Sequence, residues 1–157
     1  MKKYSFVIVA FVLFVTACKQ GSKTIHLNED ASFTLADTLP ENPLLEKVLT
    51  AAIDTKDSTM ATLYANKTAW EYAIAHEDAN YPAGAVLYQV TWKQKPDSVW
   101  FGANIPKTIH TIERISYTSN SPANYELYEG RPLRKSKATP DTARIAWITG
   151  QKMAIAP

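Results

Sequence analysis

The segment AVLYQVTWKQ, residues 85–94, decides the fold of this chain. Successive side chains of a β-strand point to opposite faces, and this segment alternates accordingly. One face holds Val86, Tyr88, Val90 and Trp92, and the other holds Leu87, Gln89, Thr91 and Lys93. Pro96 suits the second position of a type I turn at Lys95–Ser98, and residues 99–105 predict a second strand. Together the two strands predict a hairpin at the centre of an antiparallel sheet.

Further strands are expected on both sides of this hairpin. Residues 108–118 are rich in Ile and Thr and predict a third sheet strand, and residues 125–129 predict a fourth. Upstream, residues 59–65 predict a short strand. Residues 135–140 are expected to form a basic loop.

Three helices are expected around the sheet. Asn42 and Pro43 are residue types that favour a helix N-cap and first position, and the apolar residues after them recur at helical spacing, which predicts a helix over 42–54. Residues 67–76 predict a second helix, and a third is expected after Asp141. The fold class is therefore α+β, an antiparallel β-sheet of about four to five strands with flanking α-helices.

The N-terminus predicts export and a lipid anchor. Lys2 and Lys3 precede an apolar run and a small residue before Cys18, which is the pattern of a secretory signal. The apolar run is shorter than the about 20 residues of a membrane helix. An aliphatic residue, two small residues and then Cys resemble the lipobox of bacterial lipoproteins, in which the Cys carries lipid. We expect a signal peptide over 1–17, a flexible tether over 18–39 and a domain over 40–157.

The composition of the chain excludes several classes of function. The 17 basic residues lose Lys2 and Lys3 with the signal, which leaves 15 against 15 acidic ones, so the exported part has no basic surplus for nucleic acid. Cys18 is the only cysteine, and its lipidation excludes disulfides, cysteine–metal sites and a cysteine nucleophile. Lys19 stands where an Asp retains many lipoproteins in the inner membrane, which predicts the outer membrane.

Five motifs occur in a distinctive order along most of the chain. They are MATLYAN (60–66), YPAGAVL (81–87), VTWK (90–93), WFGA (100–103) and YEG (128–130). The set resembles small exported proteins of the cytochrome P-460 superfamily. The resemblance implies an antiparallel sheet with packed helices and, in haem-bearing members, a c-type haem that binds nitric oxide or oxidises hydroxylamine. A C-x-x-C-H run is absent from this sequence, so covalent haem is not expected.

The aromatic hairpin supplies the first candidate ligand-binding residues, which are Trp92, Lys93, Trp100 and Phe101. Such aromatics can wall a flat ligand, with a lysine directed at an anionic group or ring. Lys93 alternates with Trp92, however, so the two side chains are expected on opposite faces, and burial in the core is the competing interpretation. Tyr128, in the last motif, is a further candidate.

Glu113 and two histidines complete the candidate residues. Glu113 alternates with apolar residues, and a buried carboxylate there needs a partner such as Arg131 or a backbone N–H. His76 and His110 are weak candidates for a haem ligand, because their sequence spacing matches no metal motif. No metal site is expected otherwise.

The leading hypothesis is a lipid-anchored cell-envelope protein with a cytochrome P-460-like domain. It would act as a ligand-binding or accessory module without covalent haem. One alternative is a haem protein that binds nitric oxide or oxidises hydroxylamine through non-covalently held haem. Another is an envelope lipoprotein whose aromatic strands bind a protein partner.

Overall fold

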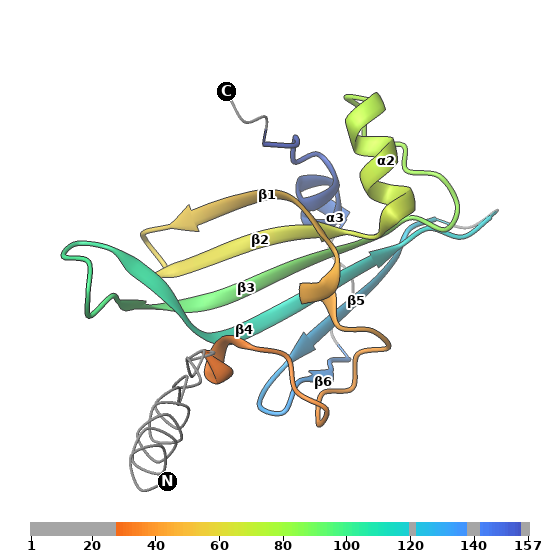
Figure 1. Ribbon diagram of the computed structural model, residues 1–157. Helices are drawn as coiled ribbons and strands as arrows, with labels where there is room; N and C mark the ends of the chain where they lie inside the picture. The colour runs from red at the N-terminus through yellow and green to blue at the C-terminus, as the bar shows by residue number, and fades with distance from the viewer. Residues whose placement is uncertain (1–27, 120–121, 138–141, 155–157) are drawn as a thin grey trace, which may run out of the picture.

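A six-stranded antiparallel sheet forms the centre of the molecule (Figure 1). The computed structural model describes residues 28–119, 122–137 and 142–154. Each strand pairs with its neighbour in sequence, in the order β1 to β6. The strands are β1 (Lys47–Asp54), β2 (Thr59–Ala65), β3 (Val86–Pro96), β4 (Asn104–Ser116), β5 (Asn124–Glu129) and β6 (Arg134–Lys135). The α+β class is confirmed, with six strands rather than four to five.

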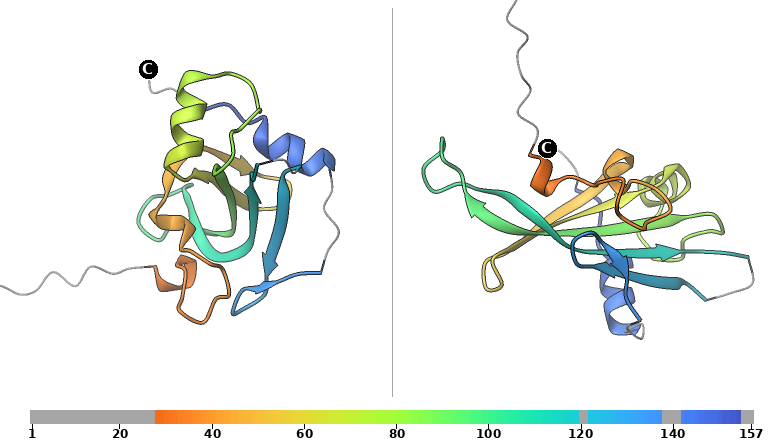
Figure 2. Two further views of the ribbon diagram at one scale, coloured as in Figure 1. Left: turned by 90° about the vertical axis from the view of Figure 1, so that its right-hand side faces the viewer. Right: turned by 90° about the horizontal axis from the view of Figure 1, so that it is seen from below.

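In the described part of the chain, two α-helices and two short 3-10 helices accompany the sheet. They are α2 (Lys67–Ala75), α3 (Thr142–Thr149), η1 (Glu29–Ala31) and η2 (Pro43–Leu45). The two views of Figure 2 show α3 on one side of the sheet and the N-terminal segment with η1 on the other. We call these two sides the helix face and the N-terminal face. Among the described residues, no helix is long and apolar enough to cross a membrane.

The central strand β3 is buried on both faces. Leu87 points to the helix face, where it packs in a cluster with Leu63, Ile115 and Ile148. Its neighbour Tyr88 points to the N-terminal face and packs in a second cluster. The alternating side chains of β3 therefore point into two apolar cores, one on each face of the sheet, and neither face is open to solvent there.

The central hairpin is longer than the sequence predicts. β3 pairs with β4, and residues 97–103 form the tip between them. The expected strand over 99–105 is wrong for its first five residues, and Trp100 and Phe101 are 71% and 108% exposed. Two local features bend the chain here. The Asp97 carboxylate accepts hydrogen bonds from two following backbone N–H groups, and Gly102 has a φ of +81°, which favours glycine.

The expected helix over 42–54 is also wrong, because most of this segment is strand β1. Asn42 does cap a turn, since its side chain accepts a hydrogen bond from the backbone N–H of Leu44, but that turn is only η2. Leu49 is the single buried residue of β1. An edge strand with one buried side chain has no period-two signal, and pairing with β2 outweighs the helical spacing of its apolar residues.

Part of the expected tether belongs to the fold. Residues 28–39 pack on the N-terminal face, where Leu39 is buried. The Trp92 indole N–H donates a hydrogen bond of 2.9 Å to the carbonyl of Ala31. Residues 1–27, with the expected signal peptide and lipid anchor, lie outside the described residues.

The expected third strand over 108–118 is not a separate strand, because β4 runs without a break from Asn104 through Pro106 to Ser116. The other elements lie close to their expected positions. β2 has the predicted bounds, α2 ends one residue earlier than expected, and β5 begins one residue earlier. β6 occupies the start of the expected basic loop. The last helix ends at Thr149, so Gly150 follows it rather than interrupting it, and its expected cap Asp141 lies outside the described residues.

Shortening a side chain under the helix face tests this core. Leu87 has no exposed surface, so we expect Leu87→Ala to lower the free energy of unfolding by about 2–5 kcal/mol. Leu45 is 83% exposed, and Leu45→Ala is expected to change it by less than about 0.5 kcal/mol. Urea titration followed by circular dichroism measures both variants. Equal losses would contradict the placement of Leu87 in the core.

Candidate functional site

A cavity of about 590 Å³ opens on the helix face beside α3, and we call it the sheet-face cavity. It exists because α3 is short. Eight helical residues extend only about 12 Å, whereas the 11 residues of β3 extend about 36 Å. The residues lining the cavity come from β1, the β1–β2 turn, β2, β3, β4 and α3.

The floor of the cavity is polar. Gln89, Thr91 and Thr111 point to the helix face from the two central strands, and Thr91 and Thr111 are direct cross-strand partners. The Gln89 amide oxygen accepts a hydrogen bond of 3.1 Å from the side chain of Gln151. The helix face therefore changes along its length, from aliphatic residues under α3 to hydrogen-bonding groups in the uncovered part.

One wall of the cavity consists of Arg144 and Trp147 from α3. The guanidinium carbon of Arg144 lies 4.5 Å from the centroid of the Trp147 ring, within cation–π distance. Trp147 is 50% exposed, so part of its indole surface is open to the cavity and to solvent. A large aromatic surface beside hydrogen-bonding groups is the usual composition of a small-molecule site.

Glu113 holds this wall in place. Its Oε1 lies 2.9 Å from Nε of Arg144 and its Oε2 lies 2.6 Å from Nη2, which is a bidentate pair. The Tyr125 hydroxyl donates a further hydrogen bond of 2.7 Å to Oε1. Glu113 is 5% exposed, so its expected burial is observed, but its partner is Arg144 rather than Arg131. Arg131 instead pairs with Asp30.

Lys93 and His110 lie on other parts of the cavity lining. The register of the β3–β4 pair passes from Trp92–Ile109 to Thr91–Thr111, so His110 is the extra residue of a β-bulge. Lys93 forms no ion pair with the residues that the structure describes. Together with Arg144, these side chains give the cavity basic groups, and Asp54 and Asp57 of the β1–β2 turn add acidic ones.

The structure separates the predicted aromatic cluster. Trp92 is buried on the N-terminal face, on the side of the sheet opposite Lys93. Trp100 and Phe101 are exposed at the hairpin tip. None of these three aromatic side chains lines the sheet-face cavity. The expectation that Trp92 and Lys93 face opposite ways matches this geometry.

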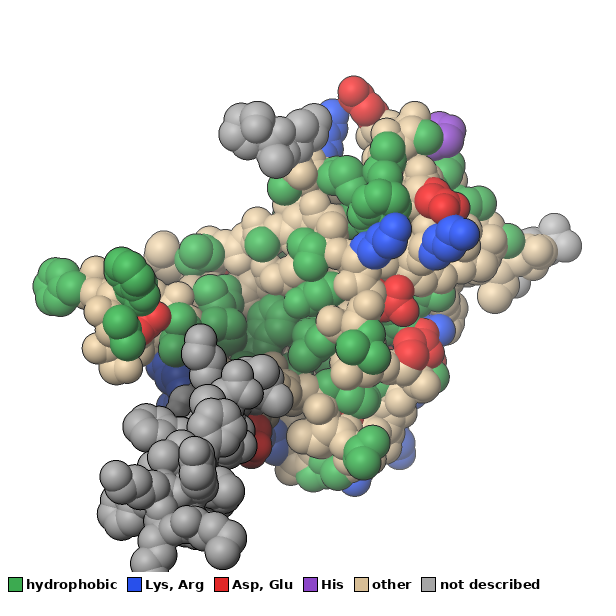
Figure 3. Space-filling view, in the orientation of Figure 1, with side chains coloured by type: hydrophobic (Ala, Val, Ile, Leu, Met, Phe, Trp, Pro, Cys, Tyr) green, Lys and Arg blue, Asp and Glu red, His purple; other side chains and the backbone are tan. Residues whose placement is uncertain are grey.

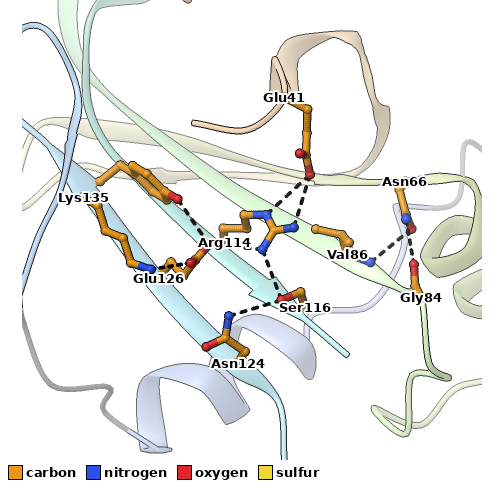
Figure 4. A network of polar contacts seen from close by, with 10 residues as sticks. Glu41, Asn66, Gly84, Val86, Arg114, Ser116, Asn124, Glu126 and Lys135 are labelled. Atoms are coloured by element: carbon orange, nitrogen blue, oxygen red, sulfur yellow. Dashed lines mark hydrogen bonds and ion pairs between the residues drawn. The ribbon is translucent and has the colours of Figure 1, made fainter. Parts of the chain in front are cut away.

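Tyr128 lies on the N-terminal face, and its hydroxyl donates a hydrogen bond of 3.2 Å to Glu126. Glu126 belongs to a polar network (Figure 4). Arg114 is the centre of this network, and it pairs with Glu126 at 3.1 Å and with Glu41 at 3.4 Å. Burial would raise the pKa of Glu126, but Lys135 and Arg114 outweigh it and hold that pKa below its usual value. Burial and the Glu126 carboxylate raise the pKa of Tyr128 to about 12. The network connects the N-terminal segment to β4, β5 and β6.

His76 lines a second cavity, of about 460 Å³, between the end of α2 and residues 149–153. Its ring stacks on Tyr72 with a centroid distance of 4.1 Å, and its Nδ1 lies 3.1 Å from the Tyr72 carbonyl oxygen. The Tyr72 hydroxyl donates a hydrogen bond to Asp78, which raises the pKa of Tyr72 to about 12. His76 is thus held against its own helix.

These positions fit a porphyrin poorly. His110 is exposed on a sheet face whose neighbouring groups are mostly polar, and His76 is exposed at the end of a helix. A haem site needs an axial ligand inside a largely apolar slot, because the macrocycle is flat and apolar. Within the described ranges, no group of three or more His, Cys, Asp and Glu side chains is placed to hold a metal ion.

Sequence reasoning missed Arg144 and the position of Trp147 on the cavity wall. A signal for Arg144 was present, because a carboxylate on an apolar strand face requires a cation and the last helix contains one. Comparison with known proteins finds no matching family and no matching curated protein.

Removing the charge of Glu113 tests its role as a positioning residue for α3. We expect Glu113→Gln to weaken the Arg144 contact, lower the free energy of unfolding by about 1–3 kcal/mol and speed amide exchange in residues 142–149. Glu129→Gln is the matched control, since Glu129 is exposed on the same sheet. Hydrogen–deuterium exchange read by mass spectrometry compares the two. Unchanged exchange in α3 would show that Glu113 does not hold the helix.

Proposed function

We propose that this chain is a lipid-anchored protein of the cell envelope, with a domain of the cytochrome P-460 type that binds a small ligand and carries no covalent haem. The sheet-face cavity is the observation that carries the binding role, because it combines an open aromatic surface, hydrogen-bonding groups and basic side chains. The ordered motifs support the domain type. The lipobox-like segment ending at Cys18 supports the anchor.

The anchor is compatible with the place where the folded part begins. Ten residue steps separate Cys18 from Asn28, and an extended chain of that length reaches at most about 35 Å. A lipid on Cys18 would therefore keep the domain close to the membrane surface. Lys19 favours the outer membrane as that location.

The cavity lining suggests the chemistry of the ligand. The indole of Trp147 offers a flat apolar surface, and the Thr91 and Thr111 side chains can hydrogen-bond to polar groups. The charged side chains of the lining are of both signs, because Asp54 and Asp57 accompany Lys93, and Arg144 is paired with Glu113. We therefore propose a small, flat molecule with hydrogen-bonding groups as the ligand, and Lys93 can pair with an anionic one. In this role Glu113 and Arg144 position the aromatic wall and take no part in proton transfer.

Mass spectrometry of the protein from its native host tests the anchor. The expected mass is that of a chain beginning at Cys18 with diacylglycerol on its thiol, and Cys18→Ser should abolish the modification. Membrane fractionation of the same cells is expected to place the wild-type protein in the outer membrane. An unmodified N-terminus, or a Cys18 thiol that reacts with iodoacetamide, would refute the anchor.

Titration with anilinonaphthalene sulfonate, a flat aromatic anion, tests the cavity. We expect Trp147→Ala to weaken its binding about tenfold, which corresponds to one aromatic contact of about 1.4 kcal/mol. Lys93→Gln should also weaken it, because the ligand loses a cationic partner. Trp100→Ala is the matched control for binding of the probe at the exposed hairpin tip, since Trp100 lies outside the cavity lining. Equal losses in the Trp100 and Trp147 variants would refute the site.

The same preparation distinguishes the haem alternative. A stoichiometric Soret band on addition of haemin, lost in His110→Ala or His76→Ala, would favour a protein that holds haem non-covalently and would overturn the proposal. We expect no such band, because neither histidine lies in an enclosed apolar slot.

A further inference from the structure

We propose that the tip of the β3–β4 hairpin is a second membrane contact, which inserts Val99, Trp100 and Phe101 into the interface of the bilayer. These three consecutive apolar side chains are 78%, 71% and 108% exposed. Figure 3 shows hydrophobic side chains gathered at the end of this hairpin. A patch of this kind at the end of a projecting hairpin needs an apolar environment outside the protein.

The tip has a defined structure that presents these side chains outward. The backbone N–H of Asp97 donates a hydrogen bond of 2.9 Å to the carbonyl of Ala103, which closes the hairpin. The Asp97 carboxylate accepts hydrogen bonds from the backbone N–H groups of Val99, at 2.7 Å, and Trp100, at 3.3 Å. These hydrogen bonds already order the loop. Contact with a membrane would therefore cost little further conformational entropy.

The beginning of the folded chain lies on the same hairpin. The Asn28 side chain donates a hydrogen bond of 2.7 Å to the carbonyl of Pro106 in β4. Five residue steps separate Phe101 from Pro106, which is at most about 17 Å of extended chain. Figures 1 and 2 both show η1 beside this hairpin. The described chain therefore begins beside this hairpin, and a lipid at Cys18, ten residue steps before Asn28, would lie within reach of the surface that the tip would enter.

The charges around the tip favour a lipid surface. Lys95 in β3 and Lys107 in β4 lie on either side of the tip. Lys93 lies two residues before Lys95 in β3. Asp97 is the one acidic residue between positions 93 and 107. The two strand ends next to the tip therefore carry a net positive charge, which anionic lipid headgroups attract. Each basic residue contributes about 1 kcal/mol near such a surface.

The size and composition of the patch favour a bilayer over a protein partner. Three side chains offer on the order of 400–500 Å², whereas a stable protein interface buries about 800 Å² on each side. Tryptophan is enriched where membranes meet water, because its ring is apolar and its N–H is polar. Both the area of the patch and its residue types therefore favour a lipid bilayer over a protein partner.

Quenching of tryptophan fluorescence by lipid tests this inference, which rests on the proposed anchor. The full chain is reconstituted into vesicles of phosphatidylethanolamine and phosphatidylglycerol that contain doxyl-labelled lipid. We expect Trp100→Phe to remove most of the lipid-dependent quenching, because the reporter is lost while the apolar tip is kept. Trp147→Phe, which removes the other largely exposed tryptophan, should leave the quenching in place.

Each result decides the question. Quenching that is lost with Trp100 and is reduced when phosphatidylcholine replaces phosphatidylglycerol supports the inserted, lysine-flanked tip. The inference is overturned if Trp100→Phe leaves the quenching unchanged, or if aqueous iodide still quenches wild-type Trp100 in the vesicles. It is also overturned if a protein is found crosslinked to the tip in cells. The intact mass of the reconstituted chain separates a failure of the tip from a failure of the lipid anchor, since only the second leaves Cys18 unmodified.

Discussion

The structure depends on one constraint, which is that the central strand β3 must be shielded from water on both faces. Leu87 and Tyr88 point in opposite directions and neither is exposed. The sequence supplies few elements to shield them, namely α2 and α3 on one side and the segment 28–45 on the other. The bidentate contact of Glu113 with Arg144 fixes α3 in this position. Because the helix is short, the rest of the helix face stays open, and the sheet-face cavity follows from this incomplete cover.

The predictable parts of the fold are those with a strong local signal. β2, α2, β3 and β5 were predicted within about two residues, because alternation or helical spacing is reinforced there by burial on a defined face. β1 lies in a segment whose apolar spacing predicts a helix, because an edge strand with one buried residue has no such signal. The sequence of the hairpin tip predicts a strand, because Val99, Trp100 and Phe101 are residues that favour strands. Their exposure depends on the turn made by Asp97 and Gly102, which residue type alone does not reveal.

The candidate site was predictable in its parts but not as an assembly. Alternation placed Lys93 and Trp92 on opposite faces, and the apolar neighbours of Glu113 indicated a buried carboxylate. The partner Arg144 is 31 residues away from Glu113, and nothing local in the sequence specifies which cation approaches it. His110 was placed on a strand, but the bulge that puts it on the cavity lining is a feature of the β3–β4 register. The site is therefore formed by contacts between residues that are far apart in the sequence.

The simple order of the sheet has a consequence for how the protein reaches this structure. Each strand pairs only with its neighbour in the chain, and four of the five connections are short loops that close at a small entropic cost, whereas residues 66–85 between β2 and β3 contain α2. Sheets of this topology can assemble stepwise from any hairpin, with fast local kinetics. The contact between Ala31 and Trp92 spans 61 residues and requires a long search. The hydrogen bond between Ala154 and Leu49 spans 105 residues, so both faces of the sheet depend on contacts between distant parts of the chain. We therefore expect both faces to be covered after the hairpins form, and their apolar residues to favour aggregation until then.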